Sequence, residues 1–145
     1  MTRRWRGPVQ TVLLDTNVIV SGLLSGDSPP GRLLMAWQDG AFALLSSRRQ
    51  IDELRRVMAY DRLRTRIGPQ QALDVLDNLD ASAVMVEPAA GVELSSDPDD
   101  NVILATAIAG RADLIVSGDK RHMLVLGGAE GIPIVSAAEA ISRLW

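Results

Sequence analysis

The sequence predicts an α/β protein in which a short parallel sheet is covered by helices on both faces. Predicted strands and helices alternate along the chain, as they do in proteins built on parallel sheets. The predicted strands are short, continuous apolar runs, which is typical of a sheet buried on both faces. The 145 residues have the size of one ordinary domain, and 47% of them are hydrophobic. We therefore expect a single domain over residues 1–145, with a basic extension at residues 1–9.

The first half of the chain is expected to contain two strands and three helices. Gly40 ends a helix whose apolar stripe includes Trp37, which we expect in the core or at a dimer interface. Ser46 or Ser47 is expected to cap the third helix. The expected elements are a strand at 9–14, a helix at 17–24, a loop at 25–31, a helix at 31–39, a strand at 42–45 and a helix from the serine cap to about residue 59.

The second half of the chain continues this alternation. Asp97 and Pro98 suit the N-cap and the first position of a helix. The expected elements are a helix at 69–80, a strand at 83–87, a helix at 97–110, a strand at 113–118, a turn at 119–126, a strand at 132–136 and a final helix from residue 137. The apolar positions of the first of these helices are Ala72, Leu73, Val75, Leu76 and Leu79.

The composition excludes several kinds of chemistry. The chain has no cysteine, which excludes disulfides, thiolate zinc sites and cysteine nucleophiles. His122 is the one histidine, so a mechanism that needs two imidazoles within one chain is excluded as well. Because His122 lies in the predicted turn beside Lys120 and Arg121, we expect it to be a surface or packing residue.

The N-terminal segment resembles a secretory signal only at first sight. A basic start is followed by an apolar run, but Asp15 and Asn17 interrupt that run and no A-x-A cleavage pattern follows it. No apolar run approaches the roughly 18 residues that a membrane span needs. We therefore expect a soluble, cytoplasmic protein without a membrane partner.

Arginines are concentrated in one segment of a chain whose net charge is −3. Residues 48–66 contain seven arginines and three acids, a local net charge of +4. On a helical wheel Arg48, Arg49, Arg55 and Arg56 fall on one side of the helix, together with Asp52. Such a face is either a solvated surface or a surface that contacts phosphates, which arginine binds in a bidentate manner.

Two aspartates follow predicted strands directly. Asp15 comes at the carboxyl end of the first strand, and Asp119 comes at the carboxyl end of the strand at 113–118. Ligands of parallel sheets bind at this edge. Two carboxylates about 4 Å apart repel by roughly 4 kcal/mol at an effective dielectric constant near 20. Such a cluster is maintained by raised pKa values or by a bound cation.

Two further acids are candidates for the same site. Glu53 falls on the border of the apolar face of its helix, where it is either a boundary residue or a residue that points into a site. Asp99 and Asp100 follow the Asp97 cap, and acids in a first helical turn complement the helix dipole. That explanation is incomplete, because residues 102–109 are apolar nearly all round and predict a buried helix.

The candidate ligand set therefore consists of Asp15, Glu53, Asp100 and Asp119. Hard oxygen ligands without a histidine or cysteine companion point to Mg²⁺ or Mn²⁺. Such an ion can activate water and neutralise the charge that develops on a phosphodiester.

Several segments together resemble the PIN domain, and specifically the prokaryotic toxin-type group related to VapC ribonucleases. They are "LLDTNVIVSGLL", "IDEL", "DPDDNVILATAIAGRADLIVSGDKRHML" and "IPIVSAAEAI". The resemblance spans residues 10–143, and its specificity comes from the order and spacing of these motifs.

The resemblance implies a three-layer α/β/α sandwich with the activity of a metal-dependent endoribonuclease on single-stranded RNA. By motif, the catalytic and metal-binding residues are Asp15, Glu53, Asp100 and Asp119, and the supporting residues are Asn17, Asp99 and Ser117. The resemblance also implies Mg²⁺ or Mn²⁺, a homodimer, and a role as the toxin of a toxin–antitoxin pair with a cognate antitoxin as partner. Near such a site, Arg48, Arg49, Arg55 and Arg56 would contact the RNA.

Two other functions are compatible with parts of the sequence. A non-catalytic RNA- or protein-binding PIN domain would keep the acids without using them. A phosphoacceptor receiver domain is also an α/β protein with acids at strand ends, but it needs an adjacent acid pair after its first strand. This chain has a single acid there, Asp15 in "LLDTN", so we reject the receiver.

Overall fold

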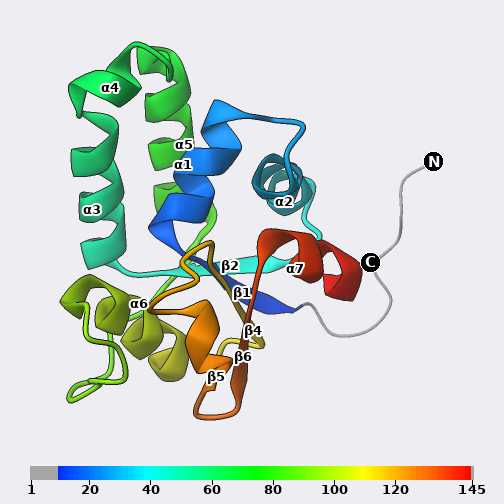
Figure 1. Ribbon diagram of the computed structural model, residues 1–145. Coiled ribbons are helices and arrows are strands. Elements are labelled where there is room, and N and C mark those ends of the chain that lie inside the picture. The colour runs from blue at the N-terminus through cyan, green and yellow to red at the C-terminus, as the bar shows by residue number, and fades with distance from the viewer. Residues whose placement is uncertain (1–9, 145) are drawn as a thin grey trace.

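The computed structural model describes residues 10–144, and the expected basic extension at residues 1–9 lies outside the described residues. Its centre is a six-stranded sheet in the order β3-β2-β1-β4-β6-β5 (Figure 1). The strands are β1 (Thr11–Leu14), β2 (Ala43–Ser46), β3 (Val84–Met85), β4 (Leu114–Val116), β5 (Gly128–Ala129) and β6 (Ile132–Val135). All neighbouring strands are parallel except β5 and β6, which are antiparallel.

Seven α-helices and one short 3₁₀ helix surround the sheet within the described residues. They are α1 (Thr16–Leu24), α2 (Pro29–Gln38), α3 (Arg48–Met58), α4 (Asp61–Arg64), α5 (Pro69–Ser82), α6 (Pro98–Ala109), η1 (Leu124–Leu126) and α7 (Ala137–Leu144). None of these helices has both the length and the apolar character that crossing a membrane requires.

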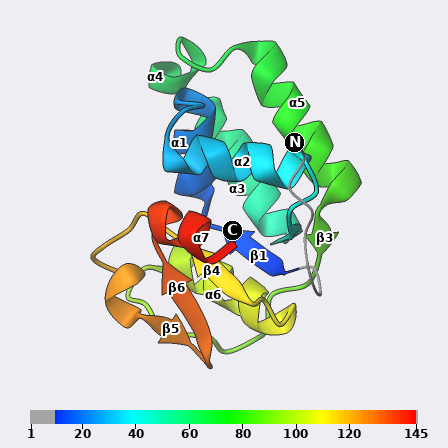
Figure 2. The ribbon, with the colours of Figure 1, turned by 90° about the vertical axis from the view of Figure 1, so that its right-hand side faces the viewer.

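Strand β1 divides the core into two halves, because successive side chains of a strand point to opposite faces. Val12 and Leu14 belong to the larger cluster, which also contains buried residues of α1, α2, α3, α5 and α7. Leu13 belongs to the smaller cluster, which it shares with residues of α6 such as Leu104. Figures 1 and 2 show α6 on the opposite side of the strands from α1 and α2. The predicted three-layer α/β/α fold is therefore confirmed.

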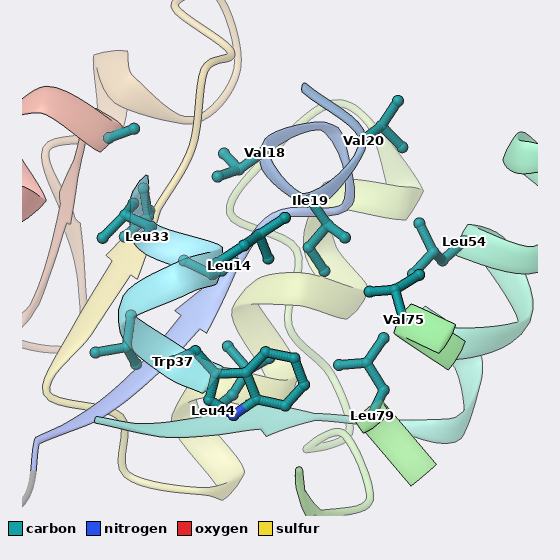
Figure 3. Close-up of a cluster of buried hydrophobic side chains, with 14 of the residues drawn as sticks. Leu14, Val18, Ile19, Val20, Leu33, Trp37, Leu44, Leu54, Val75 and Leu79 are labelled. Carbon is teal, nitrogen blue, oxygen red and sulfur yellow. The ribbon is translucent and has the colours of Figure 1, made fainter. Parts of the chain in front are cut away.

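The aromatic residues of the larger cluster are Trp37 and Phe42, and most of its other members are aliphatic. Figure 3 shows Trp37 among its aliphatic neighbours. Trp37 lies in it with 7% of its surface exposed, so its place is the core. The buried stripe of α5 is narrower than the sequence predicted, because Leu73 is 54% exposed while Leu76 and Leu79 are buried. Leu73 therefore does not belong to the core.

Some boundaries differ from the prediction for identifiable reasons. Helix α2 begins at Pro29, before the expected residue 31, because the Ser28 hydroxyl accepts the N–H of Gly31 and caps it at 3.3 Å. Helix α4 and the antiparallel strand β5 were not predicted. A two-residue turn joins β5 to β6, with φ values of 47° at Glu130 and 83° at Gly131. Two positive φ values are typical of a tight hairpin, but a two-residue strand has too little periodicity to be recognised in a sequence.

Candidate metal centre

Asp15 lies at the carboxyl end of β1, at the point where β1 pairs with β4. The pairing of Leu14 with Val116 brings the next residues of the two strands together. The N–H of Asp15 donates to the carbonyl oxygen of Val116 at 2.8 Å. The hydroxyl of Ser117 donates to Oδ2 of Asp15 at 2.9 Å. With 5% of its surface exposed, Asp15 is a buried carboxylate held in one orientation.

Asp119 lies in the loop after β4, which ends at Val116 and is shorter than the expected strand at 113–118. The Ser117 oxygen accepts the N–H of Asp119 at 3.1 Å, so one hydroxyl contacts both aspartates. Oδ1 of Asp119 accepts the backbone N–H groups of Arg121 at 2.9 Å and of His122 at 3.0 Å. Its Oδ2 lies 3.2 Å from Nδ1 of His122.

Asp100 lies in the first turn of α6 and is buried. The Ser95 hydroxyl donates to its Oδ2 at 3.2 Å. The side chain of Asn101 fastens the backbone of Ser95 with two hydrogen bonds of 2.8 Å each. Asp97 is the N-cap, because its Oδ1 accepts the N–H of Asp99 at 3.0 Å. The capping role therefore belongs to Asp97, and Asp100 is available for another function.

Glu53 is half-buried on α3, and its charge acts on the carboxylate of Asp15. Burial, together with the negative charges of Asp100 and Glu53, raises the pKa of Asp15 to about 6 against the opposing hydrogen bond from Ser117. Burial also raises the pKa of Asp100, with additional repulsion from Asp97 and Asp119. Electrostatic repulsion therefore connects all four predicted acids.

Asp119 differs from the other acids in its titration. Partial burial by itself raises its pKa, but the N–H groups of His122 and Arg121 and the imidazole of His122 outweigh that effect. The pKa of Asp119 is therefore held below its ordinary value. Asp119 is an ionised carboxylate beside two acids that resist ionisation, which is a suitable starting point for binding a cation.

Two further observations fit a divalent cation at this place. No lysine or arginine within residues 10–144 forms an ion pair with Asp15, Glu53 or Asp100. The hydroxyl of Thr16, directly after Asp15, is buried and has no hydrogen-bond partner within residues 10–144. A donor set of carboxylate oxygens suits a hard cation, and Mg²⁺ and Mn²⁺ are such cations.

The lone histidine occupies a place that we did not predict. Asp100, Asp119 and His122 each offer one ligand atom, and these three atoms lie within 4.8 Å of one another. The side chain of His122 is partly exposed, as expected of a surface residue, and the turn after Asp119 also directs its ring back to that carboxylate. The signal in the sequence was the spacing of three residues in "DKRH".

The supporting residues that were predicted lie in different surroundings. Ser117 contacts Asp15 and Asp119 as described above. Asn17 is exposed on the first turn of α1, and its side chain forms no hydrogen bond with residues 10–144. Asp99 is exposed and faces a cavity that Glu53 also lines.

Gln50 is a supporting residue that the sequence did not reveal. It is 3% exposed in α3, one turn before Glu53. Its side-chain nitrogen donates to the carbonyl oxygen of Leu14 at 2.6 Å, and its side-chain oxygen accepts from the Ser46 hydroxyl at 2.6 Å. This bridge joins the helix of Glu53 to the strand that ends at Asp15.

The structure divides the four predicted RNA-contacting arginines into two pairs. Arg48 forms an ion pair of 2.9 Å with Asp80, and Arg55 forms one of 3.2 Å with Asp52. Arg49 and Arg56 form no ion pair within residues 10–144. Instead they line a cavity of about 250 Å³, together with Glu53 and other residues of α3 and α6.

Comparison with known proteins gives two matches. A family model described as "PIN domain" matches residues 11–121. An uncharacterized protein of Methanocaldococcus jannaschii is 26% identical over 110 residues, which cover 75% of this chain and 70% of that protein. The family match contains the four acids and ends immediately before His122.

Proposed function

Because the chain belongs to the PIN domain family, we propose that it is an endoribonuclease that hydrolyses single-stranded RNA with Mg²⁺ or Mn²⁺. PIN domains are generally metal-dependent nucleases, so the family supports the reaction class. The observation that carries the proposal is the cluster of Asp15, Glu53, Asp100 and Asp119, whose mutual repulsion is not relieved by a lysine or arginine within residues 10–144.

The residues of this site would act mainly by positioning. A divalent ion, when bound, supplies an activated water and neutralises the charge on the phosphate. Ser117 holds Asp15 and Asp119 in a fixed relation, and Ser95 holds Asp100, so three of the carboxylates are oriented before a substrate arrives. Hydrolysis of the bond between phosphorus and the 3′ oxygen adds the water oxygen to phosphorus and a proton to the leaving oxygen. The products are a 5′-phosphate and a 3′-hydroxyl.

Arg49 and Arg56 are the proposed contacts for the RNA backbone. They share a cavity with Glu53, and neither is engaged by an acid within residues 10–144. Guanidinium groups bind phosphate oxygens in a bidentate manner, so a strand that passes along this cavity would be led towards the acids. We assign Arg48 and Arg55 to the solvated surface, because Asp80 and Asp52 already pair with them.

We further propose that the protein is a cytoplasmic toxin that forms a homodimer and is neutralised by a cognate antitoxin. The toxin-type motifs support this role. An apolar groove of about 730 Å³ between α3, α4 and α5, with Leu73 and Leu76 among its lining residues, offers a surface for a protein partner. Induced expression of the wild type, but not of Asp15→Asn, should arrest the growth of a bacterial host. Normal growth with a well-expressed wild type would contradict the toxin role.

The alternative is a PIN domain that binds RNA or protein without cleaving it. Cleavage of a mixed pool of single-stranded RNA, with Mn²⁺, with Mg²⁺ and with EDTA, separates the two functions. We expect cleavage that needs a metal, that is lost in Asp15→Asn and that is retained in Asp77→Asn, which neutralises an exposed acid on α5. A folded wild type that binds RNA but leaves it intact with either metal would favour the alternative.

A further inference from the structure

His122 lies in a position where its ring adds a nitrogen to the oxygen ligands of the candidate centre. One ring nitrogen lies within 4.8 Å of ligand oxygens of both Asp100 and Asp119. A metal ion that binds three such atoms at about 2.0–2.3 Å brings them within roughly 3–4 Å of one another, so small side-chain adjustments are sufficient. The family match covers residues 11–121 and does not include this histidine, and the quoted motif that contains it assigns it no role.

The surrounding turn holds the histidine at this place. The N–H of His122 donates to Oδ1 of Asp119 at 3.0 Å, and the N–H of Leu124 donates to the backbone oxygen of Asp119 at 2.8 Å. The next residue, Met123, is completely buried in the smaller core cluster. Since the backbone is anchored on both sides of the ring, the imidazole is presented to Asp119 without a large loss of conformational freedom on binding.

A simple pair between His122 and Asp119 explains only part of this arrangement. Such a pair accounts for the contact with Asp119, but it leaves Asp15 and Glu53 without any lysine or arginine as a partner within residues 10–144. A divalent ion held by Asp100, Asp119 and the imidazole would place two positive charges beside these acids, which the pair alone does not do. Imidazole is a good ligand for transition metals, whereas Mg²⁺ binds oxygen ligands and retains its waters.

We propose that His122 is a ligand of the divalent ion bound by Asp100 and Asp119, and that its nitrogen makes the centre prefer Mn²⁺ to Mg²⁺. This inference rests on the metal-dependent function proposed above and deepens it. It places His122 in the metal centre and attributes the preference for Mn²⁺ to this residue.

The experiment that tests it is pulsed electron paramagnetic resonance of Mn²⁺ bound to the full chain, without RNA. Coordination by imidazole is expected to produce electron spin echo modulation from directly bound ¹⁴N in the wild type. The modulation should be absent in His122→Asn and present in Arg121→Gln, which changes the neighbouring exposed side chain of the same turn. Because the wild-type spectrum alone reports the ligand, a variant that fails to fold does not weaken the test.

Calorimetric titration with each metal gives the second readout. The affinity of His122→Asn for Mn²⁺ should be lower by about tenfold or more, while its affinity for Mg²⁺ should change much less. Wild-type protein that binds Mn²⁺ without ¹⁴N modulation would overturn the inference and leave the proposed nuclease intact. Wild-type protein that shows the modulation but cleaves no RNA would overturn the proposed nuclease and leave His122 as a ligand.

Discussion

The side-chain nitrogen of Gln50 donates a hydrogen bond of 2.6 Å to the carbonyl oxygen of Leu14, the residue before Asp15. Gln50 and Glu53 lie one turn apart on α3, so this bond connects the helix that carries one acid to the strand that carries another. The Ser46 hydroxyl donates to the other end of the same amide. Gln50 therefore links the helix of Glu53 to the end of the strand that leads to Asp15.

Gln50→Leu should weaken both the fold and the metal centre. The substitution leaves the buried carbonyl oxygen of Leu14 without its donor, which costs about 1–3 kcal/mol, and leaves the Ser46 hydroxyl with a 3.5 Å contact to the Ser47 carbonyl oxygen. The looser contact between α3 and β1 should lower the Mn²⁺ affinity by about tenfold. Urea unfolding and calorimetric titration measure the two effects, with Gln38→Leu as a control at an exposed glutamine of α2. Equal stability of the two variants would contradict the bridging role of Gln50.

Asp15→Asn should stabilise the metal-free protein while it abolishes metal binding. The amide has the size of the carboxylate and can still accept the hydrogen bond from Ser117, but it avoids the cost of a buried charge. A pKa of about 6 in the folded protein, compared with 3.8, corresponds to at most about 3 kcal/mol at neutral pH. Urea unfolding in EDTA measures the gain. A variant that is less stable than the wild type under these conditions would show that the carboxylate contributes to the fold.

The free energy of unfolding of the metal-free protein should also depend on pH through Asp15. Asp15 holds its proton more tightly in the folded state than in the unfolded state. Its contribution to the stability of the fold is therefore fully present below about pH 4 and is lost as the pH rises towards 6. Asp100 acts in the same direction, and the lowered pKa of Asp119 opposes both. The free energy of unfolding in EDTA should therefore fall between about pH 4 and 6 by more in the wild type than in Asp15→Asn. Identical pH profiles for the two proteins would contradict the assignment to Asp15.

Replacing Arg49 or Arg56 by alanine should weaken RNA binding, whereas the same change at Arg48 or Arg55 should have little effect. The reason is that Asp80 and Asp52 engage the second pair. Each lost phosphate contact should reduce the slope of log affinity against log salt by roughly 0.7 for single-stranded RNA. Fluorescence anisotropy in Ca²⁺ or EDTA at several salt concentrations measures this slope without cleavage. Equal losses for all four variants would indicate a diffuse basic surface.

Gly31→Ala should destabilise the protein where the first turn of α2 packs against the loop before it. A Cβ atom at this residue would lie 2.4 Å from the carbonyl oxygens of both Ser25 and Gly26, and backbone atoms cannot easily move aside. We expect a loss of about 1–3 kcal/mol or more in the free energy of unfolding. Gly26→Ala is the matched control, because no atom lies within 4 Å of its added Cβ. Thermal unfolding of the two variants should therefore differ clearly, and similar melting temperatures would contradict the close packing.

The differences from the predicted fold arise where local sequence patterns carry too little information. Helix α6 was predicted from its apolar residues and the Asp97-Pro98 start, and it begins at Pro98 as expected. Strand β5 and helix α4 were missed because elements of two and four residues show no periodicity. Leu73 was wrongly placed in the core because a helical stripe shows which residues share a face, but not how wide the contact with the neighbouring helices is.

The sequence by itself determined the alternation of strands and helices and the positions of Asp15 and Asp119 beyond the ends of their strands, because local periodicity and chain order carry that information. Only the tertiary structure decided which groups meet. Ser117 reaches Asp15 over a separation of 102 residues, Gln50 reaches Leu14 over 36, and Asp80 reaches Arg48 over 32. Such contacts depend on strand register and on the order of strands in the sheet, which follow from the packing of the whole chain rather than from any short segment.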